Sequence, residues 1–213
     1  MIHLDTKKAL RVQRAMDHEL RRAMKGLRRP REGHPRPFYI SYLLHSLDGL
    51  DVWGRYGSIF NSEPVQGCDL YAEVRVGSHR FDQSVDGSLT TELSDRESFN
   101  WLVGPQDLDE EAVRYAFWKL TEHKYKEALQ EYYDKKKILI EQHLRKDAQS
   151  FSREERVVHN MPAARVRFSA KRWEEFVRKG SNIFRKHSGI IDPYLSIRGA
   201  NRTRIFVNSE CTR

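Results

Sequence analysis

The chain has 213 residues, of which 32% are charged and 38% hydrophobic. This length suits one domain of ordinary size with its own core. Aromatic residues make up 11% of the chain, which argues against disorder over most of its length. These values favour a folded protein with a large charged surface.

Several features of the sequence favour the cytoplasm. No run of about 18 apolar residues occurs, so no membrane-spanning helix is expected. The charged N-terminus lacks the apolar core of a secretory signal. Cys68 and Cys211 stand far apart and outside any CxxC pair. Two reduced thiols in a cytoplasmic protein without membrane contact are therefore expected.

The net charge of +8 is concentrated at the N-terminal end. Residues 1–36 hold eleven lysines and arginines and four acidic residues, so they carry +7 and the remaining chain only +1. The basic character is therefore expected to belong to an N-terminal arm. We assign residues 1–36 to a basic amphipathic helix with a proline-rich linker, and 37–213 to an α+β domain that could also include the arm.

Residues 4–27 carry an apolar stripe at helical spacing, with Asp5 or Thr6 able to cap the helix. The run "RRPREGHPRP" follows as a polar linker. The face opposite the apolar stripe holds Lys7, Arg11, Arg14, Arg21, Arg22 and Lys25.

Strands are expected after the linker. Residues 38–45 alternate, and Asp48-Gly49 favours a two-residue hairpin turn before a return strand over residues 51–61. Gly54 and Gly57 within that strand suggest a bulge or a close backbone approach. A third strand is predicted in "CDLYAEVRVG", residues 68–77, because apolar and polar residues alternate strictly there.

Residues 80–101 are expected to form a long polar loop, and residues 107–149 a helix. Asp107 can cap this helix, and Asp109 to Glu111 suit its positive end. A single helix of this length would measure roughly 60 Å, so it must project from the domain or break near Asp134–Lys137. Its expected core stripe consists of Val113, Ala116, Phe117, Leu120, Ala128, Leu129 and Tyr132.

Another amphipathic helix is predicted from Ser169, its cap, to Gly189. Two short strands, 194–198 and 204–208, are expected around "GANR". The element order favours an α+β fold with an antiparallel or mixed sheet, an N-terminal helix, a long central helix and a C-terminal helix plus hairpin. The apolar side of the last helix would hold Trp173, Phe176, Val177, Ile183 and Phe184.

A search for catalytic residues finds one weak candidate. His79, Asp82 and Ser84, with Asp86 nearby, have the residue types of a hydrolase triad. Triad residues are brought together by the fold, so proximity in one segment is a poor signal, and a polar loop is the favoured interpretation.

The other residue types also lack catalytic spacing. His123 and His143 do not have the spacing of a zinc protease helix. The adjacent Glu110 and Glu111 suit a helix N-terminus. Gly54 and Gly57 lie within a strand, not in a phosphate-binding loop. We therefore assign no catalytic, cofactor-binding or metal-binding residue to this chain.

The basic arm has two interpretations. Its cations could follow a phosphate backbone, or they could form the solvated face of a docked helix and a polar linker. No aromatic residues interleave with them, so no base-stacking platform is present and nucleic acid is not the expected partner. The cations in question are Arg11, Arg14, Arg21, Arg22, Lys25, Arg28, Arg29 and Arg31.

The order of "ALRVQRAMDHELRRAMKGL", "RPFYISYLL", "VWGRYGSIFNSE", "DLYAEVRVGSHRFDQS", "EAVRYAFWKLTEHKYKEAL" and "IFVNSE" resembles the N-terminal part of TldD/PmbA proteins, also described as modulators of DNA gyrase. "PFYISY" and "RIFVNSE" are the most specific pieces. The resemblance implies an N-terminal α+β domain packed on a larger C-terminal domain. In TldD that later domain carries an HExxxH zinc motif, and TldD–TldE dimers enclose a cavity and cleave unfolded peptides.

This chain departs from the family pattern near its end. It contains no HExxxH, so zinc is implied only for the missing C-terminal domain, and Cys211 replaces the glycine that usually follows Asn-Ser-Glu. We expect a truncated, split or excised N-terminal domain that acts as a scaffold for a zinc metallopeptidase and lacks catalytic residues. Its expected partner is a C-terminal TldD/PmbA-like domain or a second subunit, with peptide as the substrate of the full assembly. The alternative is a basic-arm binding module for nucleic acid or an acidic protein.

Overall fold

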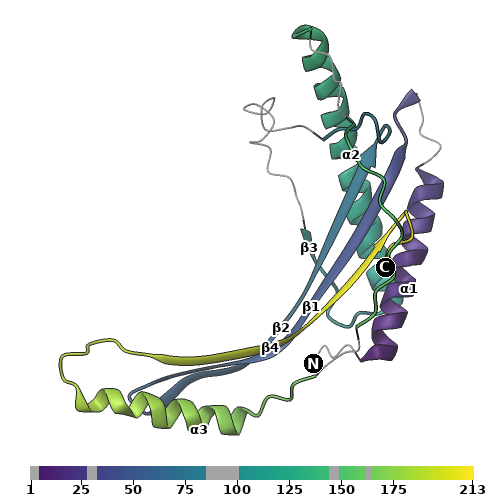
Figure 1. The fold of residues 1–213 in the computed structure, drawn as a ribbon. Helices are drawn as coiled ribbons and strands as arrows, with labels where there is room; N and C mark the ends of the chain where they lie inside the picture. Colours follow the sequence, from purple (N-terminus) through teal and green to yellow (C-terminus); the bar gives the residue numbers. More distant parts are fainter. Residues whose placement is uncertain (1–4, 28–32, 85–100, 144–148, 162–164) are drawn as a thin grey trace.

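The computed structural model describes residues 5–27, 33–84, 101–143, 149–161 and 165–213. It has two layers, a sheet and a set of helices, which confirms the predicted α+β fold (Figure 1). No helix in these ranges is long and apolar enough to cross a membrane. The elements are α1 (Thr6–Gly26), β1 (Pro37–Arg55), β2 (Ser58–Val76), β3 (Trp101–Val103), α2 (Glu110–Glu141), α3 (Ala170–Ser181), the 3-10 helix η2 (Asn182–Lys186) and β4 (Leu195–Asn208).

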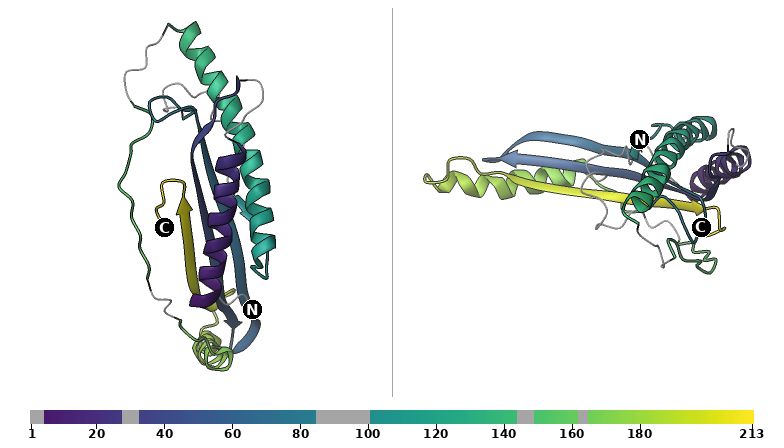
Figure 2. Two further views of the ribbon diagram at one scale, coloured as in Figure 1. Left: turned by 90° about the vertical axis from the view of Figure 1, so that its right-hand side faces the viewer. Right: turned by 90° about the horizontal axis from the view of Figure 1, so that it is seen from above.

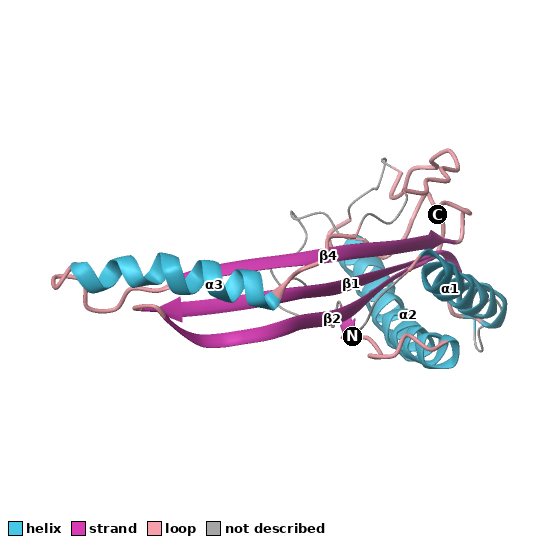
Figure 3. Ribbon diagram, turned by 90° about the horizontal axis from the view of Figure 1, so that it is seen from below, coloured by secondary structure: helices cyan, strands magenta, loops and turns pink. Residues whose placement is uncertain are grey.

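The sheet is antiparallel with the order β3-β2-β1-β4, so β1 is paired on both sides. The long strands bend, and the three α-helices lie on the outer side of the bend (Figures 1 and 3). Alternate residues of β1 explain this arrangement, because Tyr42 and Leu44 pack toward α1 and α2 while Leu50 and Val52 pack toward α3. All the helices therefore cover one face of one sheet.

The main core lies between α1, α2 and the first half of β1. Val12, Met16 and Leu20 of α1 are buried there, as the predicted apolar stripe requires. The ring of Tyr42 stacks on Phe117 with 4.4 Å between centroids, and its hydroxyl lies 2.6 Å from Thr121 Oγ1. Two helices and the sheet thus share one continuous core.

The hairpin turn predicted at Asp48-Gly49 is wrong. β1 continues through Gly49, which pairs with Val65 of β2 and Ala200 of β4. A Cβ at position 49 would lie 2.2 Å from the Gly199 carbonyl oxygen, so this glycine permits close strand approach instead of a turn. The turn lies at Tyr56 and Gly57, whose φ angles are 48° and 76°.

The expected return strand over residues 51–61 is therefore split by the turn between the end of β1 and the start of β2, and the expected third strand lies in β2. Its second half shows the predicted alternation, with Cys68, Leu70 and Val74 buried. The register shifts between Trp53 and Gly54, which confirms the bulge expected at Gly54. Gly57, in contrast, belongs to the turn.

Three further boundaries differ from the prediction. Asp109, not Asp107, caps α2, because its carboxylate accepts from the amides of Glu111 and Ala112. Of the two alternatives for this helix, a break at Asp134–Lys137 does not occur; the helix ends at Glu141, before the expected residue 149. α3 ends at Ser181 and continues as η2 to Lys186, so Gly189 does not end it.

The two C-terminal strands predicted from the sequence are joined in the structure. The two strands expected around "GANR" form the single strand β4, because Gly199 to Arg202 pair with Leu47 to Leu50 of β1. Of the predicted loop over residues 80–101, residues 85–100 lie outside the described ranges, and Trp101 belongs to β3. The caps expected at Asp5 and Ser169 are confirmed.

We predict that Gly49→Ala lowers the free energy of unfolding by about 2 kcal/mol, because the new methyl group would force β1 and β4 apart. Urea denaturation measures the change. Gly189→Ala is the matched control, since nothing lies within 4 Å of a Cβ at that position. Equal stabilities of the two variants would contradict the close approach.

Candidate functional site

The structure does not assemble His79, Asp82 and Ser84 into a catalytic triad. The Ser84 hydroxyl donates directly to Asp82 Oδ1 at 2.5 Å. His79 instead has its Nε2 3.1 Å from Oε1 of Glu210, and its ring lies against Phe38. A triad needs the histidine between serine and carboxylate, so this geometry offers no activated nucleophile.

The same segment forms a structural clamp around fully buried Asp82. Arg75 donates to Asp82 Oδ2 at 2.8 Å, and Lys135 of α2 donates to the carbonyl oxygens of Asp82 (2.7 Å) and Ser84. Gln83 bonds to the backbone of Val74 and Val76 through its side chain. These contacts fix residues 82–84 between β2 and α2.

The described residues do not fit a zinc site. No group of three or more His, Cys, Asp or Glu side chains that could hold a metal occurs among them. His123 lies 3.0 Å from Glu127, and His143 follows the end of α2. Burial raises the pKa of the Cys68 thiol to about 12, which leaves it unreactive. No chemical step of this chain can therefore be derived through zinc.

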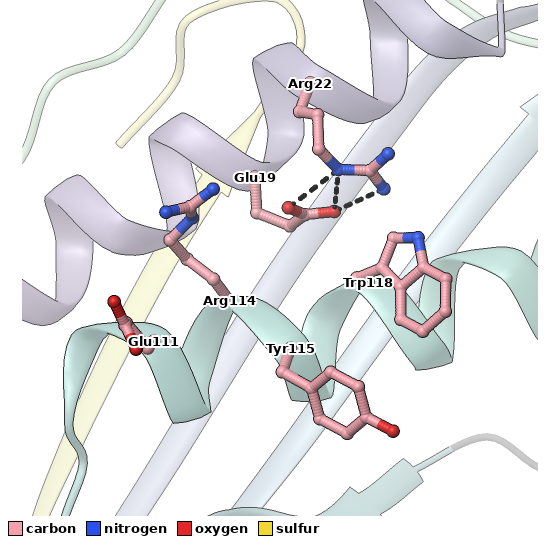
Figure 4. Close-up of a pocket in the computed structure, with 6 residues that line it drawn as sticks. All are labelled: Glu19, Arg22, Glu111, Arg114, Tyr115 and Trp118. Atoms are coloured by element: carbon pink, nitrogen blue, oxygen red, sulfur yellow. Dashed lines mark hydrogen bonds and ion pairs between the residues drawn. The ribbon is translucent and has the colours of Figure 1, made fainter.

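An open groove of about 350 Å³ lies between α1 and α2 (Figure 4). Glu19 is only 2% exposed, and Arg22 holds its carboxylate through Nε at 2.8 and 2.9 Å. This hydrogen bond raises the pKa of the Arg22 guanidinium. The lining residues are Glu19, Arg22, Glu111, Arg114, Tyr115 and Trp118.

The groove is lined by charged and aromatic side chains. Arg114 reaches from α2 toward α1, and its buried Nε has no hydrogen-bond partner in the described part of the chain (Figure 4). Tyr115 points away from α1 in the same view, and Trp118 lies near Arg22. The lining contains no histidine, cysteine or serine, so it offers no nucleophile with an adjacent base.

The far end of the sheet carries a surface that the sequence did not reveal. Five large apolar or aromatic side chains near this end are 57 to 89% exposed; two of them lie beside Trp53 and the other three lie on or after α3. We call Phe60, Phe176, Ile183, Ile191 and Tyr194 together the distal surface. Phe176 and Ile183 were expected on the buried side of α3, but of the five residues predicted there only Val177 is fully buried. In Figure 1 this region extends well beyond α1 and α2.

Ordered contacts lie beside Tyr194, on the sheet face opposite α3. Trp53 stacks on Tyr194 with 5.2 Å between ring centroids. Asp51 is buried and accepts from Arg198. Burial alone would raise the pKa of Asp51, but hydrogen bonds from Arg198 and Trp53 outweigh it and lower the pKa. These contacts order the sheet around Tyr194.

Nine of the eleven cations in residues 1–36 fall into three groups. Lys7, Arg11, Arg14, Arg21 and Lys25 are exposed on α1. Arg22 instead pairs with buried Glu19. Arg28, Arg29 and Arg31 lie outside the described residues.

Comparisons with known proteins show a likeness in structure. No protein-family model matches the sequence, and no curated protein matches it. TldE from Thermococcus kodakarensis superimposes with a TM-score of 0.51 at 11% identity, over 92% of this chain and 35% of TldE. The chain thus spans about a third of the TldE chain and shares the fold of that part.

We predict that Arg22→Ala lowers the free energy of unfolding by about 2 kcal/mol, because it leaves the buried Glu19 carboxylate without its partner. Arg21→Ala removes the same charge from the adjacent exposed position, and its effect should stay within about 0.5 kcal/mol. Urea denaturation of both variants compares them. Equal losses would show that the Glu19 pair does not stabilise the groove.

A second prediction concerns acid stability. Burial alone would raise the pKa of Asp82, but hydrogen bonds from Ser84 and Arg75 lower it below its ordinary 3.8. A carboxylate with a lowered folded-state pKa stabilises the fold above the unfolded pKa, and this contribution is lost as pH falls through the folded pKa. The wild-type stability should therefore fall more steeply below about pH 4 than that of Asp82→Asn.

Urea unfolding at pH 7, 5, 4 and 3 measures this difference. Asp82→Asn should also cost about 2 kcal/mol at pH 7, because Arg75 and Lys135 lose a charged partner. Parallel pH profiles of the two proteins would rule out the proposed titration.

Proposed function

We propose that this chain is a scaffold and assembly domain of a TldD/TldE-like peptidase and performs no catalysis itself. The observation that carries the proposal is the fold likeness to TldE, which includes nearly all of this chain but only about a third of TldE. A domain with that relation to a longer protein is expected to pack on another protein body. That body would be a C-terminal TldD/PmbA-like domain or a second subunit.

The distal surface supports a docking role. Large apolar side chains that gather at one end of a folded domain commonly mark a protein interface. Aromatic residues are also enriched in interface cores, and this surface includes Phe60, Phe176 and Tyr194. The stacked Trp53 and the Asp51–Arg198 pair would reduce the ordering cost of binding.

The residues of this chain indicate which part of such an assembly would cleave peptides. The described part of this chain provides no metal site and no assembled triad, so the peptide-cleaving zinc would belong to the partner. This chain would hold that partner in place through the distal surface.

The proposal predicts a complex with a TldD-type zinc subunit that depends on the distal surface. Phe176→Gln, Ile183→Gln and Ile191→Gln together should abolish co-elution with this subunit in size-exclusion chromatography with light scattering. These changes replace exposed apolar groups, so folding should be retained. The full-length chain alone should leave unfolded peptides intact, with or without added zinc.

The matched control removes three exposed apolar side chains elsewhere, with Ile140→Gln, Val158→Gln and Met161→Gln. It should bind the zinc subunit as the wild type does. Peptide cleavage by the chain alone, or equal loss of binding in both triple variants, would refute the proposed role.

A further inference from the structure

The outer face of α1 carries a straight line of cations. We call Lys7, Arg11, Arg14, Arg21 and Lys25 the basic row; exposed His18 lies in its middle. With His18 included, the spacing alternates between four and three residues, which places the side chains on one side of the helix. The row extends over about 27 Å at 1.5 Å per residue. Figure 2 shows α1 at the outside of the molecule, in front of the strands.

The basic row has no counter-charge within the described chain. None of its five side chains takes part in an ion pair or hydrogen bond there. The two carboxylates in the middle of α1 are engaged elsewhere, because Glu19 pairs with Arg22 and Asp17 lies 3.6 Å from Arg213. Like charges three and four residues apart repel one another, and a bound anion would relieve this repulsion.

The surroundings of the row limit the class of partner. Protein interfaces depend on apolar and aromatic anchors and are poor in lysine, whereas α1 contains no aromatic residue. Insertion into a membrane would need an apolar helix face, and that face of α1, with Val12, Met16 and Leu20, is buried in the core. A row of cations without anchors instead suits a phosphate backbone.

Two properties favour a duplex over a single strand. Single-strand binding relies on aromatic side chains on which bases stack, and the row has none. A duplex presents about one charge per 1.7 Å along its axis, so a rigid 27 Å row faces many phosphates at once. Contacts of this kind position a protein on nucleic acid without reading its sequence.

We propose that the basic row of α1 binds the phosphate backbone of double-stranded nucleic acid without sequence preference. The proposal is independent of the assembly role, because it uses neither the distal surface nor a partner subunit.

Fluorescence anisotropy with a labelled 24-base-pair DNA duplex tests it on the full-length chain. Five phosphate contacts give a slope of about −4.5 in log K against log salt, so affinity should fall about 500-fold between 50 and 200 mM salt. Lys7→Ala, Arg14→Ala and Arg21→Ala together leave two contacts. Their slope should be about −1.8, with a loss of about 12-fold over the same range.

The control variant is Lys171→Ala, Arg172→Ala and Arg178→Ala, which removes the same residue types from exposed positions of α3. It should keep the wild-type slope, and circular dichroism should show all three proteins folded. Absence of duplex binding at 50 mM salt would overturn the proposal, as would an equal change of slope in the control. Tighter binding of a single strand, or of polyglutamate in place of duplex, would also overturn it.

Discussion

The continuous strand β1 is the constraint on which the other features depend. It runs unbroken from Pro37 to Arg55 because Gly49 lets the backbone of β4 approach where any side chain would collide. A turn at this position would have ended the sheet beneath α1 and α2. Since the strand continues, the sheet has a second half. The apolar side chains of that half, Leu50 and Val52, must be buried by another element. α3 provides the cover through Val177, which packs with Leu50 and Val52.

In this arrangement buried carboxylates are ion-paired, whereas several large apolar side chains remain exposed to solvent. Two buried carboxylates are paired with cations, Glu19 with Arg22 and Asp82 with Arg75. α3 packs on the second half of the sheet through a narrow side that includes Val177, so Phe176 and Ile183 are left at the surface. The distal surface is thus a consequence of a long sheet with a small second core.

The sequence predicted the elements whose signals are local. The apolar stripe of α1, the alternation after Cys68 and the caps at Asp5 and Ser169 depend on neighbours in the chain, and the structure confirms them. The turn predicted at Asp48-Gly49 does not form, because the local turn preference of these two residues is weaker than the hydrogen bonding of β1 to two neighbouring strands. The true turn at Tyr56-Gly57 lacks the Asn or Asp that usually marks such turns.

The sites were less predictable because they depend on contacts between distant segments. His79 is near Ser84 in sequence, yet it faces Glu210 at the other end of the chain. The predicted stripe of α3 placed Phe176 and Ile183 inside, since helical spacing alone does not show how much of a helix the sheet can cover. The basic cations were visible in the sequence, but only the structure separates Arg22, which is paired, from its unpaired neighbours.

The two proposed surfaces lie at opposite ends of the same strands. α1 packs beside the first half of β1, and the distal surface belongs to the second half (Figure 1). Because β1, β2 and β4 connect both halves through continuous hydrogen bonding, a ligand on α1 and a protein on the distal surface would be held at a fixed separation. Neither would block the other. If both proposed surfaces bind, the shared strands would join the two partners without any conformational change in the sheet.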